Sequence, residues 1–295
     1  FCLARYNSDG SLDTTFNGNG KVVTAIGAST LNIGTSVAQQ ADGKLVVAGG
    51  CTVVSPDFCM VRYTVNGSPD LTFNGNGYVT TAMSSFGDRA TGIAIQTDGK
   101  IVLAGYCVDG NQPTVQPAFC LARYDASGAL DTTFNVTGMV TTALGPSENY
   151  ATGIALQPDG KIVLAGICSV ASANNFCVAR YNPDGSLDAT FNGNGKVITA
   201  ILGTSDEANA VAAQNPAAVP GVAEVASIGG FGFGLMQVYF FLAVVLPMMR
   251  GQGAKAPQKP WDGAEGLEWE VPSPAPWHTF ENPPKLDATA TRVVG

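Results

Sequence analysis

Seven cysteines form the clearest chemical pattern in this sequence. Three short apolar segments each end in Ala-Gly-x-Cys, and each is followed, after a loop of variable length, by a segment that begins Phe-Cys. If the two segments are antiparallel strands, opposed residues have Cα atoms about 4.5–5.5 Å apart, within the disulfide range of about 4.4–6.8 Å. The spacing therefore predicts three disulfides, Cys51–Cys59, Cys107–Cys120 and Cys168–Cys177.

Cys2 is the seventh cysteine, and no Ala-Gly-x-Cys segment precedes it in the chain. We expect it to pair with a cysteine of a preceding repeat that this chain lacks. Because the chain also begins at Phe1 rather than Met, we interpret it as a fragment or a processed product. Disulfides imply an oxidising compartment, whereas reduced cysteines would pack as small hydrophobic side chains. Both alternatives fit the sequence, and the tandem spacing favours disulfides.

Two segments alternate oxygen-bearing side chains in a way that could suit calcium. The pattern Asn-x-Asp-Gly-x-x-Asp occurs with its aspartates at Asp9 and Asp13, and again at Asp184 and Asp188. A hard cation takes such oxygen ligands. The same residue types also form hairpin turns in which the second aspartate caps local backbone N–H groups. The two intervening copies of the pattern are weaker, so these four aspartates are weak calcium candidates.

A catalytic site finds little support in the rest of the sequence. A Ser-His-Asp or Cys-His arrangement would have to use His278, the one histidine, which lies in a tail that we expect to be extended. The glycine-rich turns complete neither a dinucleotide fingerprint nor a phosphate-binding lysine motif. The net charge of −8 argues against a nucleic-acid partner. We therefore predict a chain that is not an enzyme and has no catalytic or cofactor-binding residue.

Strands and tight turns must position the cysteines and aspartates, because they recur with a repeat. Asp-Gly-Lys followed by a β-branched run and Ala-Gly occurs at 42–49, 98–105 and 159–166. The Phe-Cys signature begins at Phe1, Phe58, Phe119 and Phe176, at intervals of 57, 61 and 57 residues. Each Asp-Gly pair is typical of a turn that leads into a strand. A period of this size predicts a repeat architecture.

One repeat unit reads as four short strands, at 119–124, 139–143, 151–157 and 161–167. Four antiparallel strands in about sixty residues are the content of one propeller blade. Several of them are apolar on both faces, as expected for sheets packed between neighbours. The fold class predicted is mainly β: tandem four-stranded antiparallel blade-like repeats that form an incomplete β-propeller or an open stack.

These units resemble the delta-60 repeats, bacterial tandem repeats thought to build propeller-like domains. The motif Arg-Tyr-x-x-x-Gly-Ser-Leu-Asp-x-x-Phe-Asn-Gly-x-Gly at Arg5 and Arg180 carries the resemblance, with variants at Arg62 and Arg123. It covers residues 1–214 and implies a fold more than an activity. The fourth unit stops after Gln214 without its Asp-Gly turn, so we expect its last hairpin to be missing and its edge to be unpaired.

A transmembrane helix is predicted at 225–249, after a junction at 215–224, because these 25 residues carry no charge. Gly230 and Gly234 place small residues on one helical face, where another transmembrane helix could pack. Basic residues follow the helix and acidic residues precede it, so the Pro-rich acidic tail at 250–295 should be cytoplasmic and the repeats periplasmic or extracellular.

Residues 222–295 resemble the last transmembrane helix and cytoplasmic tail of bacterial cytochrome c oxidase subunit I. The resemblance lies in the glycine-rich run from Val225 and in the segments 261–269 and 272–280. It implies haem-copper chemistry, in which two haems and a copper support oxygen reduction and proton pumping. That chemistry needs several histidines, and the chain has only His278, so we expect no haem or copper in it.

Two functional hypotheses follow. The first is a non-catalytic, membrane-tethered β-repeat protein with a binding or structural role. The alternative is a fragment of cytochrome c oxidase subunit I fused to unrelated repeats and lacking all haem and copper ligands. The loss of the repeat in mid-unit at Gln214 favours a chimera, because a selected fusion should respect the blade boundary.

Overall fold

The computed structural model describes residues 1–27, 31–52, 55–109, 116–171, 173–201, 205–213, 226–229, 285–286 and 293–294. The chain divides into two compact units, Phe1–Phe231 and Gly232–Gly295. In these ranges the regular structure is β-strand, joined by turns. The mainly β prediction is thus confirmed for the part of the chain that the structure describes.

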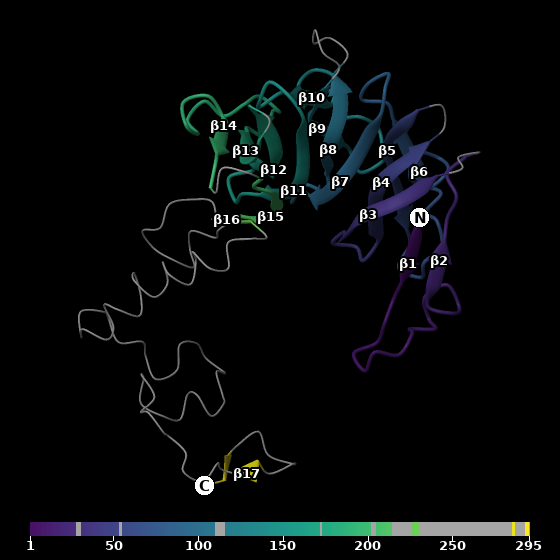
Figure 1. Ribbon diagram of the computed structural model, residues 1–295. Helices are drawn as coiled ribbons and strands as arrows, with labels where there is room; N and C mark the ends of the chain where they lie inside the picture. The colour runs from purple at the N-terminus through teal and green to yellow at the C-terminus, as the bar shows by residue number, and fades with distance from the viewer. Residues whose placement is uncertain are drawn as a thin grey trace. The chain divides into compact units, whose positions relative to one another are not determined.

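Three antiparallel sheets of four strands follow one another along the first unit, each in simple sequence order (Figure 1). They consist of β3 (Asn32–Gln39), β4 (Leu45–Thr52), β5 (Pro56–Tyr63) and β6 (Tyr78–Thr81); β7 (Asp88–Ile95), β8 (Ile101–Asp109), β9 (Gln116–Tyr124) and β10 (Met139–Thr142); and β11 (Asn149–Leu156), β12 (Ile162–Val170), β13 (Ala173–Tyr181) and β14 (Lys196–Thr199).

Two-stranded sheets flank these three sheets in the sequence. β1 (Cys2–Ala4) pairs with β2 (Lys21–Val23), and β15 (Ala208–Ala212) pairs with β16 (Ala226–Gly229). In the second unit, the described residues form one pair, β17 (Lys285–Leu286) with β18 (Val293–Val294).

The Asp-Gly turns build the hairpins as predicted. Gly43, Gly99 and Gly160 have φ values of 85°, 85° and 83°, a region that glycine enters without steric cost. Each turn joins the first strand of a sheet to the second, and the β-branched run after it becomes a buried central strand. The predicted strands at 119–124, 139–143, 151–157 and 161–167 correspond to β9, β10, β11 and β12.

The sheet boundaries differ from the predicted unit boundaries. Phe58, Phe119 and Phe176, the predicted starts of units, lie inside β5, β9 and β13, the third strand of each sheet. Each sheet therefore takes its first two strands from one sequence unit and its last two from the next. The period of a repeat follows from sequence, but its phase depends on which strands pair, and here the longest pairing runs across the loop between the cysteines.

The strand edge of the fourth unit, which we expected to be unpaired, has a partner in the structure. β15 has a partner in β16, with its bulge at Ala208/Ala210, as the bulge of β11 lies at Ala151/Gly153. Ala226–Gly229 lie within the predicted helix at 225–249, so a strand stands at its beginning. The rest of that predicted helix lies outside the described residues. No helix in the described ranges is both long enough and apolar enough to span a bilayer.

A bulge in the first strand of each sheet explains why Ala-Gly recurs. The register between β7 and β8 shifts between Ala90 and Gly92, and this brings the Arg89 carbonyl over Gly105. A Cβ at Gly105 would collide with that oxygen. The equivalent glycines, Gly49 and Gly166, face the carbonyls of Ile33 and Tyr150 in the same way. Only glycine fits under the bulge.

Each sheet buries both faces against its neighbours. On β9, Cys120, Ala122 and Tyr124 belong to a core cluster shared with the first sheet, whereas Phe119 and Leu121 belong to one shared with the third. All five side chains are at most 1% exposed. This alternation is the two-sided burial that the apolar strands predicted.

Candidate functional site

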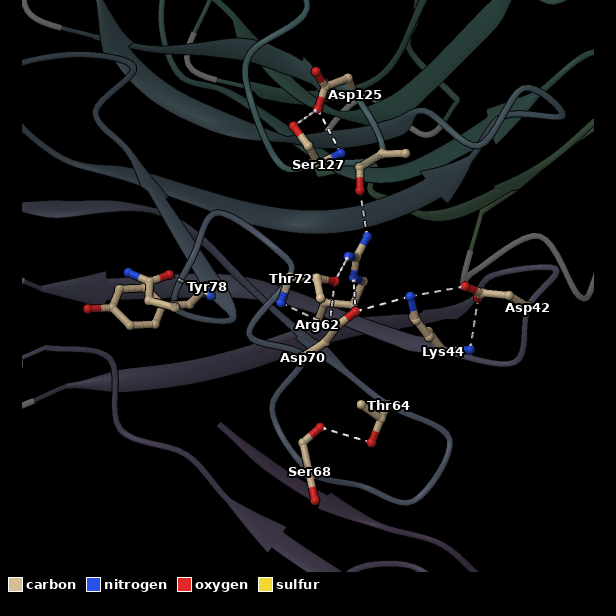
Figure 2. A network of polar contacts seen from close by, with 12 residues as sticks. Asp42, Lys44, Arg62, Thr64, Ser68, Asp70, Thr72, Tyr78, Asp125 and Ser127 are labelled. Atoms are coloured by element: carbon tan, nitrogen blue, oxygen red, sulfur yellow. Dashed lines mark hydrogen bonds and ion pairs between the residues drawn. The ribbon is translucent and has the colours of Figure 1, made fainter.

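The most elaborate polar arrangement in the described residues surrounds a buried arginine in the third strand of each sheet. In the first sheet, Arg62 Nε donates to Asp70 Oδ2 at 2.8 Å, and both side chains are 6% exposed (Figure 2). Arg62 lies in β5, and Asp70 follows in the loop that leads to β6. The backbone N–H of Asp70 donates to the Arg62 carbonyl at 2.8 Å, which fixes the distance between the two side chains.

Thr72 and Lys44 complete the set of partners around Asp70. The Thr72 hydroxyl and backbone N–H donate to Asp70 Oδ1 at 2.6 and 3.1 Å, while Lys44 Nζ lies 3.2 Å from Oδ2. Arg62 Nη2 donates to the Thr72 hydroxyl at 3.2 Å. A buried charge is tolerated only when it is paired and hydrogen-bonded, and Asp70 meets both conditions.

Arg62 also joins the first sheet to the second. Its guanidinium carbon lies 4.3 Å from the centre of the Phe73 ring, and Nη1 donates to the Ala126 carbonyl at 2.6 Å. Ala126 belongs to the turn after β9 in the next sheet. The Asn74 backbone N–H donates to the Ser127 carbonyl of that turn at 2.8 Å, and Gly128 lies against the Phe73 ring. One turn of each sheet is thus held by three groups of the preceding sheet.

The central part of this network, an arginine with its aspartate, threonine and phenylalanine, recurs in every copy of the motif. Its Arg Nε–Asp Oδ2 distances are 2.8 to 2.9 Å, and the guanidinium lies 4.5 or 4.6 Å from the ring centre. The copies are Arg5, Asp13, Thr15 and Phe16; Arg123, Asp131, Thr133, Phe134 and Lys100; and Arg180, Asp188, Thr190, Phe191 and Lys161.

The aspartates of this network are held ionised. Burial by itself raises the pKa of Asp70, but hydrogen bonds from Thr72 and the charges of Lys44 and Arg62 outweigh it and lower the pKa to about 2. Asp131 reaches a pKa of about 2 through the same balance, and Asp188 reaches about 2 chiefly through the Thr190 hydroxyl. A carboxyl with such a pKa does not act as a general acid at neutral pH.

Of the four calcium candidates, Asp9 and Asp184 lie in hairpin turns, and Asp13 and Asp188 belong to the arginine network. Asp9 Oδ1 and Asp184 Oδ1 each accept a hydrogen bond from the backbone N–H two residues on, at 2.9 Å, and from its serine hydroxyl at 2.6 Å. Asp13 and Asp188 are occupied by arginine and threonine. Among the described residues, no group of three or more His, Cys, Asp or Glu side chains could hold a metal ion.

The three predicted disulfides, Cys51–Cys59, Cys107–Cys120 and Cys168–Cys177, are present, each with Cα atoms 5.8 Å apart. Their geometry differs from the expectation, because the paired cysteines are not opposed. Cys59 faces Gly49 and Cys51 faces Asp57, so the bridge crosses the ladder diagonally. Cys2 is an exposed free thiol, and its expected partner in a preceding repeat stays a prediction.

Several predictions lie outside the described residues. They concern the packing glycines Gly230 and Gly234, the single histidine His278, and the cytoplasmic tail at 250–295 apart from its four described strand residues. The oxidase-like segment at 222–295 is likewise described only at 226–229, 285–286 and 293–294. The membrane, haem and copper statements therefore stay predictions.

Sequence reasoning missed the arginine network. Arg62 and Asp70 were both visible in the repeat motif, and the lysine was visible in Asp-Gly-Lys, but the two motifs are separated by a disulfide loop. One signal could have revealed the pairing: arginine, aspartate and lysine recur in phase with the repeat. This recurrence is informative because charged residues are rare in the sequence.

The family-model comparison agrees with this architecture. A family model described as a beta-propeller domain of unknown function, DUF5122, matches residues 1–16, 40–73, 96–134 and 157–191. A solved protein of unknown function from Dyadobacter fermentans DSM 18053 has 16% sequence identity and a TM-score of 0.35, and the match covers 61% of this chain. The match covers 52% of that protein, so the chain spans about half its length. The matched residues of the family model make the repeat part of this chain beta-propeller-like, as the resemblance to delta-60 repeats predicted.

Proposed function

We propose that this chain is a non-catalytic scaffold, in which disulfide-linked β-repeats serve binding or structure outside the cytoplasm and the segment 225–249 tethers them to a membrane. The observation that carries the proposal is that the buried charged side chains of the sheets pair within the protein. The buried arginines and aspartates, such as Arg62 and Asp70, bind one another and the next sheet, and so they hold the stack together. In three of these aspartates, Asp70, Asp131 and Asp188, the pKa is lowered to about 2, which is the opposite of the shift that a general acid at neutral pH requires.

The disulfides support the proposed compartment. Cys51–Cys59, Cys107–Cys120 and Cys168–Cys177 link the two central strands of each sheet, and such bonds persist where the surroundings are oxidising. The charge asymmetry around 225–249 supports the same side for the repeats. These are independent arguments, since one concerns thiol chemistry and the other concerns membrane insertion.

Thiol labelling in bacterial spheroplasts that express the full chain tests compartment and tether together. A membrane-impermeant maleimide should label Cys2 in intact spheroplasts, and the six remaining cysteines should react only after reduction and unfolding. The chain should stay in the membrane fraction after carbonate extraction at high pH.

Two results would contradict separate parts of the proposal. Labelling of all seven cysteines without a reductant would exclude the disulfides and the oxidising compartment. A chain recovered in the carbonate supernatant would exclude the membrane tether while leaving the scaffold itself in place. The variant Arg62→Lys tests whether the buried arginine has a catalytic role. We expect the substitution to lower the free energy of unfolding and to leave any activity of the folded chain unaltered.

A further inference from the structure

Seven Asn-Gly pairs occur in the sequence, and such a pair is the context in which asparagine most readily loses its amide nitrogen. Glycine has no side chain to hinder attack by its own backbone nitrogen on the asparagine side chain. Six of the seven asparagines are held by a side-chain hydrogen bond. Asn17, Asn74 and Asn192 donate to the carbonyls of Lys21, Tyr78 and Lys196, and Asn19, Asn76 and Asn194 accept from the backbone N–H groups of the same three residues.

Asn66 is the seventh, and it lies exposed in the turn that follows β5. Thr64 and Ser68 close this turn, because the backbone N–H and the hydroxyl of Thr64 donate to the Ser68 carbonyl at 2.8 and 3.3 Å (Figure 2). In the part of the chain that the structure describes, no group donates to or accepts from the Asn66 side chain. No side-chain contact therefore has to break before this amide reacts.

Two other copies of the turn show which residue the position suits. Asp9 and Asp184 stand where Asn66 stands, and each is followed by glycine and serine, as Asn66 is. The φ values of Gly10, Gly67 and Gly185 are 84°, 87° and 90°, and their N–H groups donate to the carbonyl three residues earlier at 2.9 to 3.0 Å. Because the backbone is the same in all three turns, a carboxylate in place of the Asn66 amide needs no change of the main chain.

A carboxylate at this position has hydrogen-bond partners that the Asn66 amide lacks. Asp184 Oδ1 accepts from the hydroxyl of Ser186 at 2.6 Å and from its backbone N–H at 2.9 Å. The pKa of Asp184 is lowered by that hydroxyl first, then by the N–H, and in part by the charge of Arg123. Ser68 follows Asn66 at the same distance along the chain and offers the same two donors.

Arg5 supplies the matching charge. Arg123 Nη1 donates at 2.6 Å to the carbonyl of the residue before Asp184, and Arg5 Nη1 donates at 2.7 Å to the carbonyl of the residue before Asn66. Arg5 thus holds the position toward Asn66 that Arg123 holds toward Asp184. A nearby cation favours the ionised form of a carboxyl, so this site suits an aspartate.

We propose that Asn66 is a site of spontaneous deamidation, at which the folded chain loses ammonia and gains an aspartate that completes the turn. The backbone nitrogen of Gly67 attacks Cγ of Asn66, and a bond forms between the two atoms. The bond from Cγ to Nδ2 breaks, and Nδ2 leaves as ammonia with the proton that the Gly67 nitrogen gives up. Water then opens the resulting succinimide ring, and no other reactant is needed.

The turn has to open before the Gly67 nitrogen can attack, because its N–H is bonded to the Thr64 carbonyl at 2.9 Å. An exposed turn opens at a lower cost in free energy than a buried central strand. The arginine that holds this turn is also the least buried of three: Arg5 is 35% exposed, whereas Arg62 and Arg123, which hold the corresponding turns after β9 and β13, are 6% exposed. The turn at Asn66 is therefore the easiest of the three to open.

Water can open the ring at either carbonyl carbon, and the two products fit the turn differently. Attack at Cγ gives aspartate and leaves the main chain as it was. Attack at the main-chain carbonyl carbon gives isoaspartate, which adds a methylene to the main chain. That product displaces the Asn66 carbonyl, which accepts from the Asn17 backbone N–H at 2.7 Å. Only the aspartate product keeps this contact.

A time course on the full chain tests the site. The folded chain is incubated at mildly alkaline pH and digested, and mass spectrometry measures conversion to aspartate or isoaspartate at each Asn-Gly pair. We expect Asn66 to react several-fold faster than each of the other six asparagines. In denaturant, where all seven side chains are free, this preference should disappear. A rate at Asn66 no greater than at the others in the folded chain would overturn the proposal, as would a preference that persists in denaturant.

The variant Asn66→Asp tests whether the product completes the turn. Its thermal unfolding temperature should lie above that of the unmodified chain, because the carboxylate gains the hydroxyl and backbone N–H of Ser68. Ser68→Ala should then lower the unfolding temperature of Asn66→Asp more than that of the unmodified chain. An unfolding temperature of Asn66→Asp below that of the unmodified chain, or an equal loss from Ser68→Ala in both, would show that the carboxylate does not complete the turn.

Discussion

Asp70 is the residue on which the charge balance of the first sheet depends. It accepts from Arg62 and Thr72 and pairs with Lys44, and its side chain is 6% exposed. Asp70→Asn would leave the guanidinium buried without its counter-charge. We expect the free energy of unfolding to fall by about 3 kcal/mol, within the range for breaking a buried pair, as measured by chemical denaturation.

The matched control for this change is Asp13→Asn. Asp13 holds the same position toward Arg5 and Thr15, but the arginine and aspartate side chains there are 35% and 19% exposed. A pair open to solvent contributes about 0–1 kcal/mol, so the loss should be much smaller. Equal losses for the two variants would show that burial does not set the strength of this interaction.

Acid should weaken the stack through the same residues. Asp70, Asp131 and Asp188 have folded pKa values of about 2, below the value of 3.8 for the free side chain. A lowered pKa contributes stability that is fully present above pH 4 and is lost as the pH falls toward 2. Denaturation curves at pH 5 and pH 2 should therefore show a larger difference for the unmodified chain than for Asp70→Asn.

Val136 offers a stabilising substitution. It has φ of 65° and is 84% exposed, at a position where the other repeats have Gly18, Gly75 and Gly193. A β-branched residue in the left-handed region is strained, whereas glycine is not. Val136→Gly should raise the free energy of unfolding by about 1 kcal/mol, as measured by thermal or chemical denaturation.

The reverse change, Gly75→Val, isolates the backbone effect. A Cβ at Gly75 meets nothing within 4 Å, so any loss must come from its φ of 73°. Stability should fall by a similar amount. If Val136→Gly destabilises the chain, the valine side chain must make a contact that outweighs the strain.

At the scale of the strand, the bulge in β7 explains why position 105 is glycine, which the alternation of apolar and polar side chains does not explain. Gly105→Ala would force a Cβ against the Arg89 carbonyl in the neighbouring strand. Backbone cannot yield as a flexible side chain can, so we expect a loss of about 2–3 kcal/mol on chemical denaturation. Hydrogen exchange should locate the damage in β7 and β8.

Gly50→Ala serves as the comparison. Gly50 lies in β4, the counterpart of β8, one residue after Gly49, which is the equivalent of Gly105. A Cβ there would lie 3.3 Å from Arg89 Cγ, an atom of a flexible side chain, and Tyr106 and Ile167 occupy the equivalent positions. Its cost should stay below about 1 kcal/mol. A cost as large as that of Gly105→Ala would refute the bulge as the cause.

The sequence predicted strands better than it predicted sheets, for a physical reason. Asp-Gly turns and apolar runs act locally, so the strands and the three disulfide pairings could be read from spacing. Pairing between strands is not local, so the phase of the sheets, the diagonal disulfides and the bulge were not predicted. The Lys44–Asp70 contact joins two loops across a sheet, and no short motif contains both residues.

At the scale of the whole first unit, stability comes from contacts between successive sheets. Threonines at the bulges donate across these interfaces: Thr35 to the Ala90 carbonyl and Thr91 to the Ala151 carbonyl, both at 2.7 Å, and Thr152 to the Ala208 carbonyl. Each sheet therefore depends on its nearest neighbours, as in other repeat proteins. Loss of structure at β15 should spread first to β11, because Thr152 lies in that strand.

This dependence decides where the repeats can be separated from the segment that follows. A chain that ends at residue 231 keeps β16, and so β15 retains its ladder partner. A chain that ends at residue 214, where the sequence repeat stops, leaves β15 without that partner, and an open strand edge favours fraying and aggregation. We expect hydrogen exchange in β15 and β11 to be faster in the shorter chain, with β7 unchanged in both. Equal exchange in the two chains would show that β16 contributes nothing to the stack and that the repeat part ends at residue 214.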